Sequence, residues 1–290
     1  MRVNGLDFTS APGKGKPLAV GRCSLEEGVL SLEGFELYES YGQLEELLRS
    51  EGPWVMGCDF PFSHPARLLR EAGEHITRTA FPARWPMPWE EYLRGVAAMT
   101  PEAFKRLMKS CPPDLRGVRE RKRVTGAVAR AASPMHVDFP PVGLMFHRGA
   151  RLLLDCPCEV APQRMNGDCR KLFEAYPGLF AERFCGGRSY KDGPSEQREK
   201  REGRRTAMLA AIRSERFRET YGFTAHFEER HARRMAADRK GDLLDAFICA
   251  IQAAWAWTKR HDNYGLPGPE KIDPETLAFE GWIMDPHCRM

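Results

Sequence analysis

The sequence predicts an α/β domain in which helices flank a mixed five-stranded sheet. Three observations support this fold class. Short apolar runs alternate with amphipathic segments, Pro- and Gly-rich stretches separate them, and a long apolar helix follows the strands. With 290 residues, 42% of them hydrophobic, the chain can bury one large core. We therefore expect a single domain over 1–290.

The first four strands and one helix are predicted in order. Val3–Phe8 is an apolar run that ends at a Pro- and Gly-rich loop, and Leu18–Cys23 is a second such run. Val29–Tyr38 alternates apolar and polar residues, so these three segments are expected to form an antiparallel meander. An amphipathic helix over Gln43–Ser50 leads to Trp54–Asp59. This last strand is apolar throughout, which places it near the centre of the sheet.

The next part of the chain is less regular. Residues 62–142 are rich in Pro and aromatic residues, and we interpret them as a helical and loop insertion after the fourth strand. Gly143–Leu154 is predicted to be extended. Lys171–Pro177 is predicted to be a strand that its proline ends.

The C-terminal part is predicted to be helical. Residues 196–220 and 224–239 are heavily charged helical segments. Asp242–Arg260 is apolar nearly all round and is expected to be a buried closing helix.

Four aspartates on three separate segments are the most informative feature of the sequence. Asp7 ends the first strand and Asp59 ends the fourth, each within a Gly-x-Asp-Phe pattern. Asp242 and Asp245 open the closing helix, three residues apart and on neighbouring faces. Carboxylates in apolar surroundings are costly unless they are paired or hold a metal, so we expect one shared site. Clustered carboxylates suit Mg²⁺ or Mn²⁺.

Each of these acids also has a structural alternative. Asp242 and Asp245 fit the cap and the acidic first turn of a helix, and Asp7 and Asp59 can end strands for reasons of turn formation. Glu174 lies within a predicted strand and is a candidate fifth ligand, with an outward-facing strand residue as an equal alternative. The order in which the acids occur along the chain favours the shared site.

Basic residues are unevenly distributed, although the net charge is only +4. Residues 115–130 carry six basic and one acidic side chain, and residues 198–240 carry thirteen basic and seven acidic ones. Solvated helix faces explain each segment alone. A positive surface beside an acidic site gives weak support for a phosphodiester substrate.

These motifs in this order resemble the ribonuclease-H-like superfamily, and in particular the DUF429 family of predicted nucleases. The Asp-x-x-Asp-Ala helix is also similar to that of RuvC-type Holliday junction resolvases, whose fourth-strand acid is commonly Glu where this chain has Asp59. The segments that carry the resemblance are Gly5–Phe8, Gly57–Pro61, Glu174–Pro177, Asp242–Ala246 and Glu280–Ile283.

The resemblance implies a metal-dependent nuclease that acts on DNA or RNA. Two divalent ions, Mg²⁺ or Mn²⁺, would be bridged by Asp7 and held by Asp59 on one side and by Asp242 and Asp245 on the other. One ion would activate a water, and the other would stabilise the leaving 3′-oxygen. Resolvase-like relatives also make a homodimer an expectation.

The residues expected to contact a substrate phosphate are basic or carry a hydroxyl group. Ser10, Lys14 and Lys16 lie in the loop after the first strand, and Lys240 precedes the acid pair. The start of the chain does not have the pattern of a signal peptide, no apolar run is long enough for a membrane span, and the cysteines lie in apolar runs. We expect a cytoplasmic protein.

Two other function classes remain open. A non-catalytic module of this fold could bind nucleic acid or a protein partner, and the absence of metal affinity would favour it. An actin-like or sugar-kinase-like ATP-dependent phosphotransferase also begins with an Asp-containing strand and a Gly-rich turn. The sequence shows neither the second Asp-Gly-rich hairpin nor the Gly-rich adenosine loop that such enzymes require.

Overall fold

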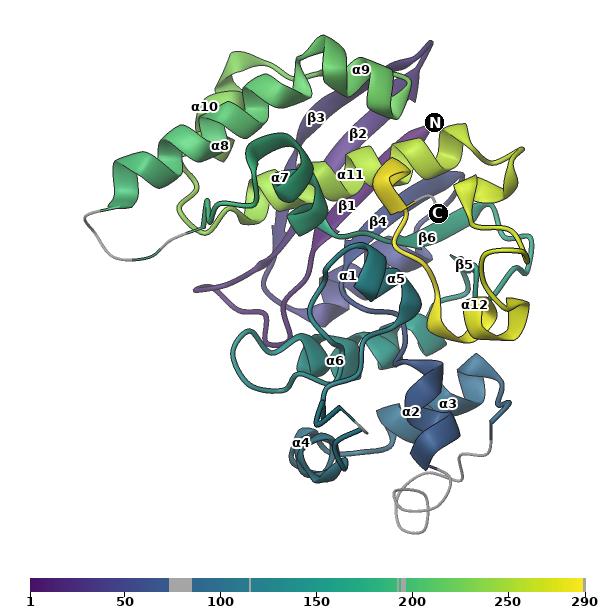
Figure 1. The fold of residues 1–290 in the computed structure, drawn as a ribbon. Coiled ribbons are helices and arrows are strands. Elements are labelled where there is room, and N and C mark those ends of the chain that lie inside the picture. The colour runs from purple at the N-terminus through teal and green to yellow at the C-terminus, as the bar shows by residue number, and fades with distance from the viewer. Residues whose placement is uncertain (73–84, 115, 192, 194–196, 289–290) are drawn as a thin grey trace.

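A mixed β-sheet lies at the centre of the molecule, with helices on both of its faces (Figure 1). The computed structural model describes residues 1–72, 85–114, 116–191, 193 and 197–288. Within them the sheet has seven strands, in the spatial order β5 (Glu159–Ala161), β6 (Arg170–Glu174), β4 (Trp54–Asp59), β1 (Arg2–Asp7), β2 (Leu18–Glu26), β3 (Val29–Tyr38) and β7 (Thr224–His226).

The α/β class, the antiparallel β1–β2–β3 meander and the central position of β4 are confirmed. The strands β4, β6 and β5 continue the sheet from β1 in parallel, and β7 adds a parallel edge strand beside β3. The predicted number of five strands is wrong. The two additional strands, β5 and β7, have three residues each, which is too short for a period-two pattern to be recognised. Thr224–His226 was predicted to be helical and is β7.

The helices follow the predicted order in most of the chain. Their bounds are α1 (Tyr41–Arg49), α2 (Ala66–Ala72), α3 (Trp89–Ala97), α4 (Pro101–Ser110), α5 (Val124–Val128), α6 (Val142–Asp155), α7 (Pro177–Cys185), α8 (Arg198–Ile212), α9 (Glu215–Tyr221), α10 (Glu229–Ala237), α11 (Asp242–Thr258) and α12 (Pro274–Glu280), with short 3-10 turns at Asn263–Gly265 and Pro286–Cys288.

Two of the helix predictions are corrected. Gly143–Leu154, expected to be extended, belongs to the helix α6. Its buried residues include Phe146, Ala150 and Leu153, which recur at helical spacing. Gly149 weakens the helical pattern of this segment, but it is needed for packing. A Cβ at this position would lie 2.2 Å from the Phe60 ring. The helix α11 is also not the last one, since α12 follows it.

The two faces of the sheet carry separate hydrophobic cores. One core includes Leu6 of β1 and Met56 of β4 and is covered by α1, α3, α4 and α6. The other includes Val3 of β1 and Val55 of β4 and is covered by α8–α11 (Figure 1). The side chains of a strand alternate between faces, so positions 3, 5 and 7 of β1 and positions 55, 57 and 59 of β4 face α11.

The helix α11 packs directly on strand backbone because three neighbouring strands present glycine to it. Gly21, Gly5 and Gly57 are register partners across β2, β1 and β4. A Cβ on Gly5 would lie 1.9 Å from the carbonyl oxygen of Ala246 in α11. A Cβ on Gly57 would be similarly excluded by α11 backbone. This glycine row fixes how closely the helix approaches the sheet.

The described residues of the predicted insertion 62–142 do not form a separate core. They include the helices α2–α5, and the buried side chains Trp89, Tyr92 and Phe104 belong to the same core as one face of the sheet.

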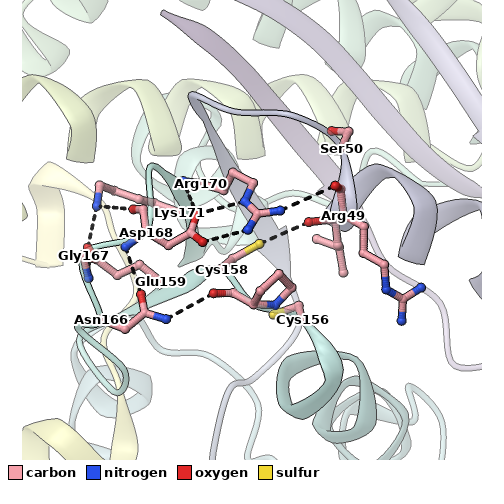
Figure 2. Close-up of polar contacts among 12 residues, drawn as sticks. Arg49, Ser50, Cys156, Cys158, Glu159, Asn166, Gly167, Asp168, Arg170 and Lys171 are labelled. Atoms are coloured by element: carbon pink, nitrogen blue, oxygen red, sulfur yellow. Dashed lines mark hydrogen bonds and ion pairs between the residues drawn. The ribbon is translucent and has the colours of Figure 1, made fainter.

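At the β5–β6 end, the loop between these strands is held by polar contacts (Figure 2). Asp168 pairs with Arg170, and Lys171 pairs with Glu159.

In the described parts of the chain, no helix has the length and apolar character that crossing a bilayer requires.

Candidate metal centre

Three of the four predicted aspartates meet at one edge of the sheet. Asp7 and Asp59 are the last residues of the parallel strands β1 and β4, and they are register partners. Asp245 reaches them from the first turn of α11. One carboxylate oxygen from each of the three lies within 4.8 Å of the others. Among the described residues, this is the group of acidic side chains whose geometry fits a metal ion.

The Gly-x-Asp-Phe pattern explains why these acids meet. Gly5 and Asp7 are two residues apart in β1, so both are on the face that α11 covers. The glycine admits the helix, and the aspartate then lies beside the first turn of that helix. Gly57 and Asp59 repeat the arrangement on β4. The phenylalanine after each aspartate belongs to the core on the opposite face.

The structure confirms only part of the structural alternative for the acids of α11, because Asp242 and Asp245 lie in its first turn but neither is its N-cap. The N-cap residue of α11 is Gly241, which has a left-handed backbone. The carboxylate of Asp238 accepts a hydrogen bond from the backbone N–H of Leu243 at 2.9 Å and from that of Lys240 at 3.2 Å. Because Asp238 supplies this stabilisation, Asp245 is left to face the strand acids.

Asp242 lies at the border of the site. It is buried and lines the same cavity as Asp7 and Asp59, but it does not belong to the three-acid group. Its pKa is raised, first by burial and then by repulsion from Asp238, while Lys191 acts in the opposite direction.

Two residues that the sequence did not indicate contact the acids. The ammonium group of Lys191 forms an ion pair with Asp245 and lies 4.0 Å from Asp7. The hydroxyl of the buried Tyr190 donates a hydrogen bond to Asp245 at 2.5 Å. Both come from the irregular segment between α7 and α8. A local pattern could not have found them, because only the tertiary fold brings this segment to the sheet edge.

The segment that delivers Lys191 is held by arginines of α8. Arg204 donates to the carbonyl oxygen of Ser189 at 2.5 Å, Arg205 donates to that of Tyr190 at 2.6 Å, and Arg201 donates to that of Lys191. Arg205 is 1% exposed. These three arginines of the basic segment 198–240 therefore bind backbone within the protein, and they do not add to a positive surface for nucleic acid.

Burial and mutual repulsion weaken the acidity of the cluster. Burial raises the pKa of Asp7 well above its ordinary value, and repulsion from Asp245 raises it further, against the attraction of Lys191. Burial and Asp245 likewise raise the pKa of Asp59 to about 7. The pKa of Lys191 is raised because attraction to Asp245 and Asp7 outweighs the opposing effect of burial. The cluster thus favours any added cation.

Glu174 is close to these acids but is already neutralised. It is the register partner of Cys58, one residue before Asp59, so its side chain leaves the sheet on the opposite face. There it is 3% exposed, pairs with the buried Arg123, and accepts a hydrogen bond from the backbone N–H of Phe62 at 3.0 Å. The structure does not bring Glu174 into the three-acid group.

The predicted phosphate-binding residues are divided. A cavity of about 300 Å³ opens over the acids, and Ser10 and Lys16 line it. Lys14 is exposed and does not line the cavity. Lys240 donates to the carbonyl oxygen of Gly15 and so helps to hold the loop that carries Lys16.

The basic residues of 115–130 are also partly internal. Arg121 and Arg123 are buried, and Arg130 pairs with Glu182.

Comparison with known proteins gives no match to a family model, to a curated protein or to a solved structure.

Proposed function

We propose that this protein is a divalent-metal-dependent phosphodiesterase of the ribonuclease-H-like superfamily, related to the DUF429 predicted nucleases, that hydrolyses nucleic acid. The observation that carries this proposal is the meeting of Asp7, Asp59 and Asp245 from two parallel strands and a helix. The antiparallel meander, the helix α1 and the central strand β4 follow the order that the resemblance implies. A fold alone does not establish an activity, so the proposal depends on the geometry of the three acids.

The chemistry of the three acids fits Mg²⁺ or Mn²⁺. These are hard cations that prefer carboxylate oxygens at roughly 2.0–2.2 Å, so two oxygens on one ion lie about 3 Å apart when adjacent and up to about 4.4 Å apart when opposite. The group of oxygens within 4.8 Å of one another matches this spacing. Asp242, at the border of the same cavity, is the residue in position to hold a second ion.

When bound, such ions supply an activated water and stabilise charge at the leaving oxygen. The protein's own residues have defined parts in this scheme. Asp7, Asp59 and Asp245 would together hold the ions, with Asp7 as the shared ligand that the resemblance implies. Lys16, at the cavity wall, is placed to attract a phosphate. No side-chain nucleophile is required.

Calorimetric titration of Mn²⁺ into metal-free protein tests the proposal. We expect saturable binding to the wild type that is lost in both Asp7→Asn and Asp245→Asn. Asp238→Asn is the matched control, because this acid lies next to the site but caps α11, and it should retain binding. Mn²⁺ binding that persists in both Asp7→Asn and Asp245→Asn would contradict a metal site at the three-acid group.

Cleavage assays follow on the same variants. Wild-type protein with Mn²⁺ or Mg²⁺ should cleave DNA or RNA, and Asp7→Asn should abolish cleavage. Metal binding without cleavage of any nucleic-acid structure would contradict the nuclease assignment.

One observation favours a second candidate, a non-catalytic module of the same fold. The ammonium group of Lys191 already supplies a positive charge to Asp7 and Asp245. In such a module this lysine would be a permanent counter-ion. Absence of Mn²⁺ binding, together with nucleic-acid or protein binding in metal-free buffer, would favour that function.

A further inference from the structure

The cavity over the acids has two chemically different sides. One side carries the charged residues Asp7, Asp59 and Lys16. The other is an apolar wall formed by the loop that precedes α6 and by its first turns. This apolar wall consists of Phe139, Pro140, Pro141, Val142 and Met145. A ligand that fills the cavity must therefore present an apolar part and, once a cation is bound at the acids, an anionic part within a short distance of it.

Phe139 is the distinctive member of the apolar wall. Its side chain is 94% exposed, whereas the other exposed large hydrophobic residues among those described range from 37% to 52%. Phe139 is also the aromatic residue in that set. A phenyl ring in this position leaves almost all of its burial free energy unused in the unliganded protein. Its ring is available to a flat apolar partner inside the cavity mouth.

We propose that the apolar wall receives an unpaired nucleotide whose base stacks on Phe139 while its phosphate lies near Lys16 and the cation that the acids would hold. This inference rests on the proposed function and specifies its substrate class as single-stranded or locally unpaired nucleic acid. Base stacking on aromatic rings tolerates every base, because each base has a π-face. In a continuous duplex both faces of a base are covered by its neighbours, so the ring of Phe139 would have no face to contact.

The size of the cavity supports the same choice. A volume of about 300 Å³ lies at the lower end of ligand pockets in proteins. It suits one nucleotide-sized group and not a section of double helix. Enzymes that act within a confined site take the nucleotide out of the base stack or use a strand that is already unpaired.

Binding of labelled oligonucleotides to the full-length protein tests the inference. Single-stranded and blunt hairpin forms of one sequence, each as DNA and as RNA, are titrated with Ca²⁺ in place of Mn²⁺. The hairpin is closed by a non-nucleotide linker, so that it contains no unpaired base. A 2-aminopurine base in the single strand reports stacking directly. We expect Phe139→Ala to weaken single-strand binding by about 5- to 150-fold, the range of one base–aromatic contact, and to abolish the quenching of 2-aminopurine. Phe139→Trp should retain both.

Two controls separate this inference from the proposed function. Met165→Ala removes another exposed apolar side chain that does not line the cavity, and it should bind like the wild type. Calorimetric Mn²⁺ binding should be unchanged in Phe139→Ala, because the substitution leaves the acids intact. Equal single-strand affinity in the wild type and Phe139→Ala, or tighter binding of the hairpin duplex, overturns the inference and leaves the metal site standing. Wild-type protein that neither binds Mn²⁺ nor cleaves nucleic acid overturns both this inference and the proposed function.

Discussion

Two groups of buried acids lie at the ends of neighbouring strands, on opposite faces of the sheet, and they are neutralised differently. Glu174 at the end of β6 has a bidentate guanidinium partner, Arg123, and a backbone donor. Asp7, Asp59 and Asp245 share one ammonium group and one tyrosine hydroxyl among three carboxylates. The first group is complete without a ligand. The second has three carboxylates and one cationic partner, so an added cation can take the place of the protons that the raised pKa values of Asp7 and Asp59 imply.

The largest expected effect comes from breaking the complete group. Arg123→Met should lower the free energy of unfolding by about 3–5 kcal/mol, because it leaves Glu174 as an unpaired buried charge. Asp7→Asn should leave stability in metal-free buffer unchanged or raise it, since it relieves repulsion among the acids. Denaturant unfolding of both variants measures the difference. Equal destabilisation by the two substitutions would erase the contrast between the groups.

A smaller effect is expected from separating the helix from the sheet. Gly5→Ala places a Cβ where the Ala246 carbonyl oxygen lies, and it should cost about 1–3 kcal/mol of stability. It should also weaken Mn²⁺ binding, because Asp245 moves with α11. Gly34→Ala in β3 is the control, since no atom lies within 4 Å of the added Cβ. Thermal unfolding and calorimetry follow both effects, and a Gly5→Ala variant with wild-type metal affinity would contradict the assigned role of the glycine row.

Removal of the shared lysine should sharpen the comparison further. Lys191→Met deletes the cation that competes for Asp245 and Asp7, so Mn²⁺ affinity should rise about tenfold, equivalent to about 1.4 kcal/mol. Metal-free stability should fall and should recover when Mn²⁺ is added. Lys16→Met, which removes an exposed lysine of the same cavity, should change metal-free stability less. Weaker Mn²⁺ binding in Lys191→Met would show that the lysine assists metal binding.

A dependence of stability on pH is also expected. Since the pKa of Asp59 is raised to about 7, the folded protein holds a proton that the unfolded chain releases near its ordinary value. The contribution of this group to metal-free stability therefore declines as pH rises from about 4 to 7 and is constant above that range. Asp59→Asn should make this decline shallower, and the remaining slope comes from Asp7, whose pKa is also raised. Unfolding across that interval compares the two proteins, and parallel pH profiles would contradict the raised pKa.

Metal binding should show the opposite trend over the same interval, because carboxylates bind metal in their deprotonated form. In the wild type, Mn²⁺ affinity should rise as pH approaches 7.

The parts of this molecule that were predictable from sequence are those in which local pattern and tertiary role coincide. The Gly-x-Asp-Phe segments are an example, because one short motif contains the residue that admits the helix, the acid beside it and the core residue on the opposite face. The strand bounds of β3 and β4 were predicted correctly because alternation and continuous apolarity are strong local patterns. Asp242 and Asp245 do open α11, and Asp245 joins Asp7 and Asp59 while Asp242 does not, although the local sequence alone favoured a capping interpretation of both.

The parts that were not predictable depend on distant contacts. Lys191 and Tyr190 reach the acids only because arginines of α8 hold their segment, and no local pattern encodes that contact. The helix α6 was predicted to be extended. Gly149 within it weakens the helical pattern, and this glycine is required by the Phe60 ring, which comes from another segment. Edge strands of three residues are defined by their neighbours and not by their own sequence.

The close approach of α11 to the sheet has a consequence for the choice of acid. Where the layers are held apart by side chains, a strand residue needs the longer arm of glutamate to share an ion with a helix residue. The bare backbone at Gly57 brings the layers together, so the short side chain of Asp59 suffices to approach Asp245. A shorter side chain has fewer rotatable bonds and loses less freedom when it is fixed. The distance between the helix and the sheet and the length of the acidic side chain would then vary together. In the sequence, this relation is visible as a glycine two residues before an aspartate in the same strand.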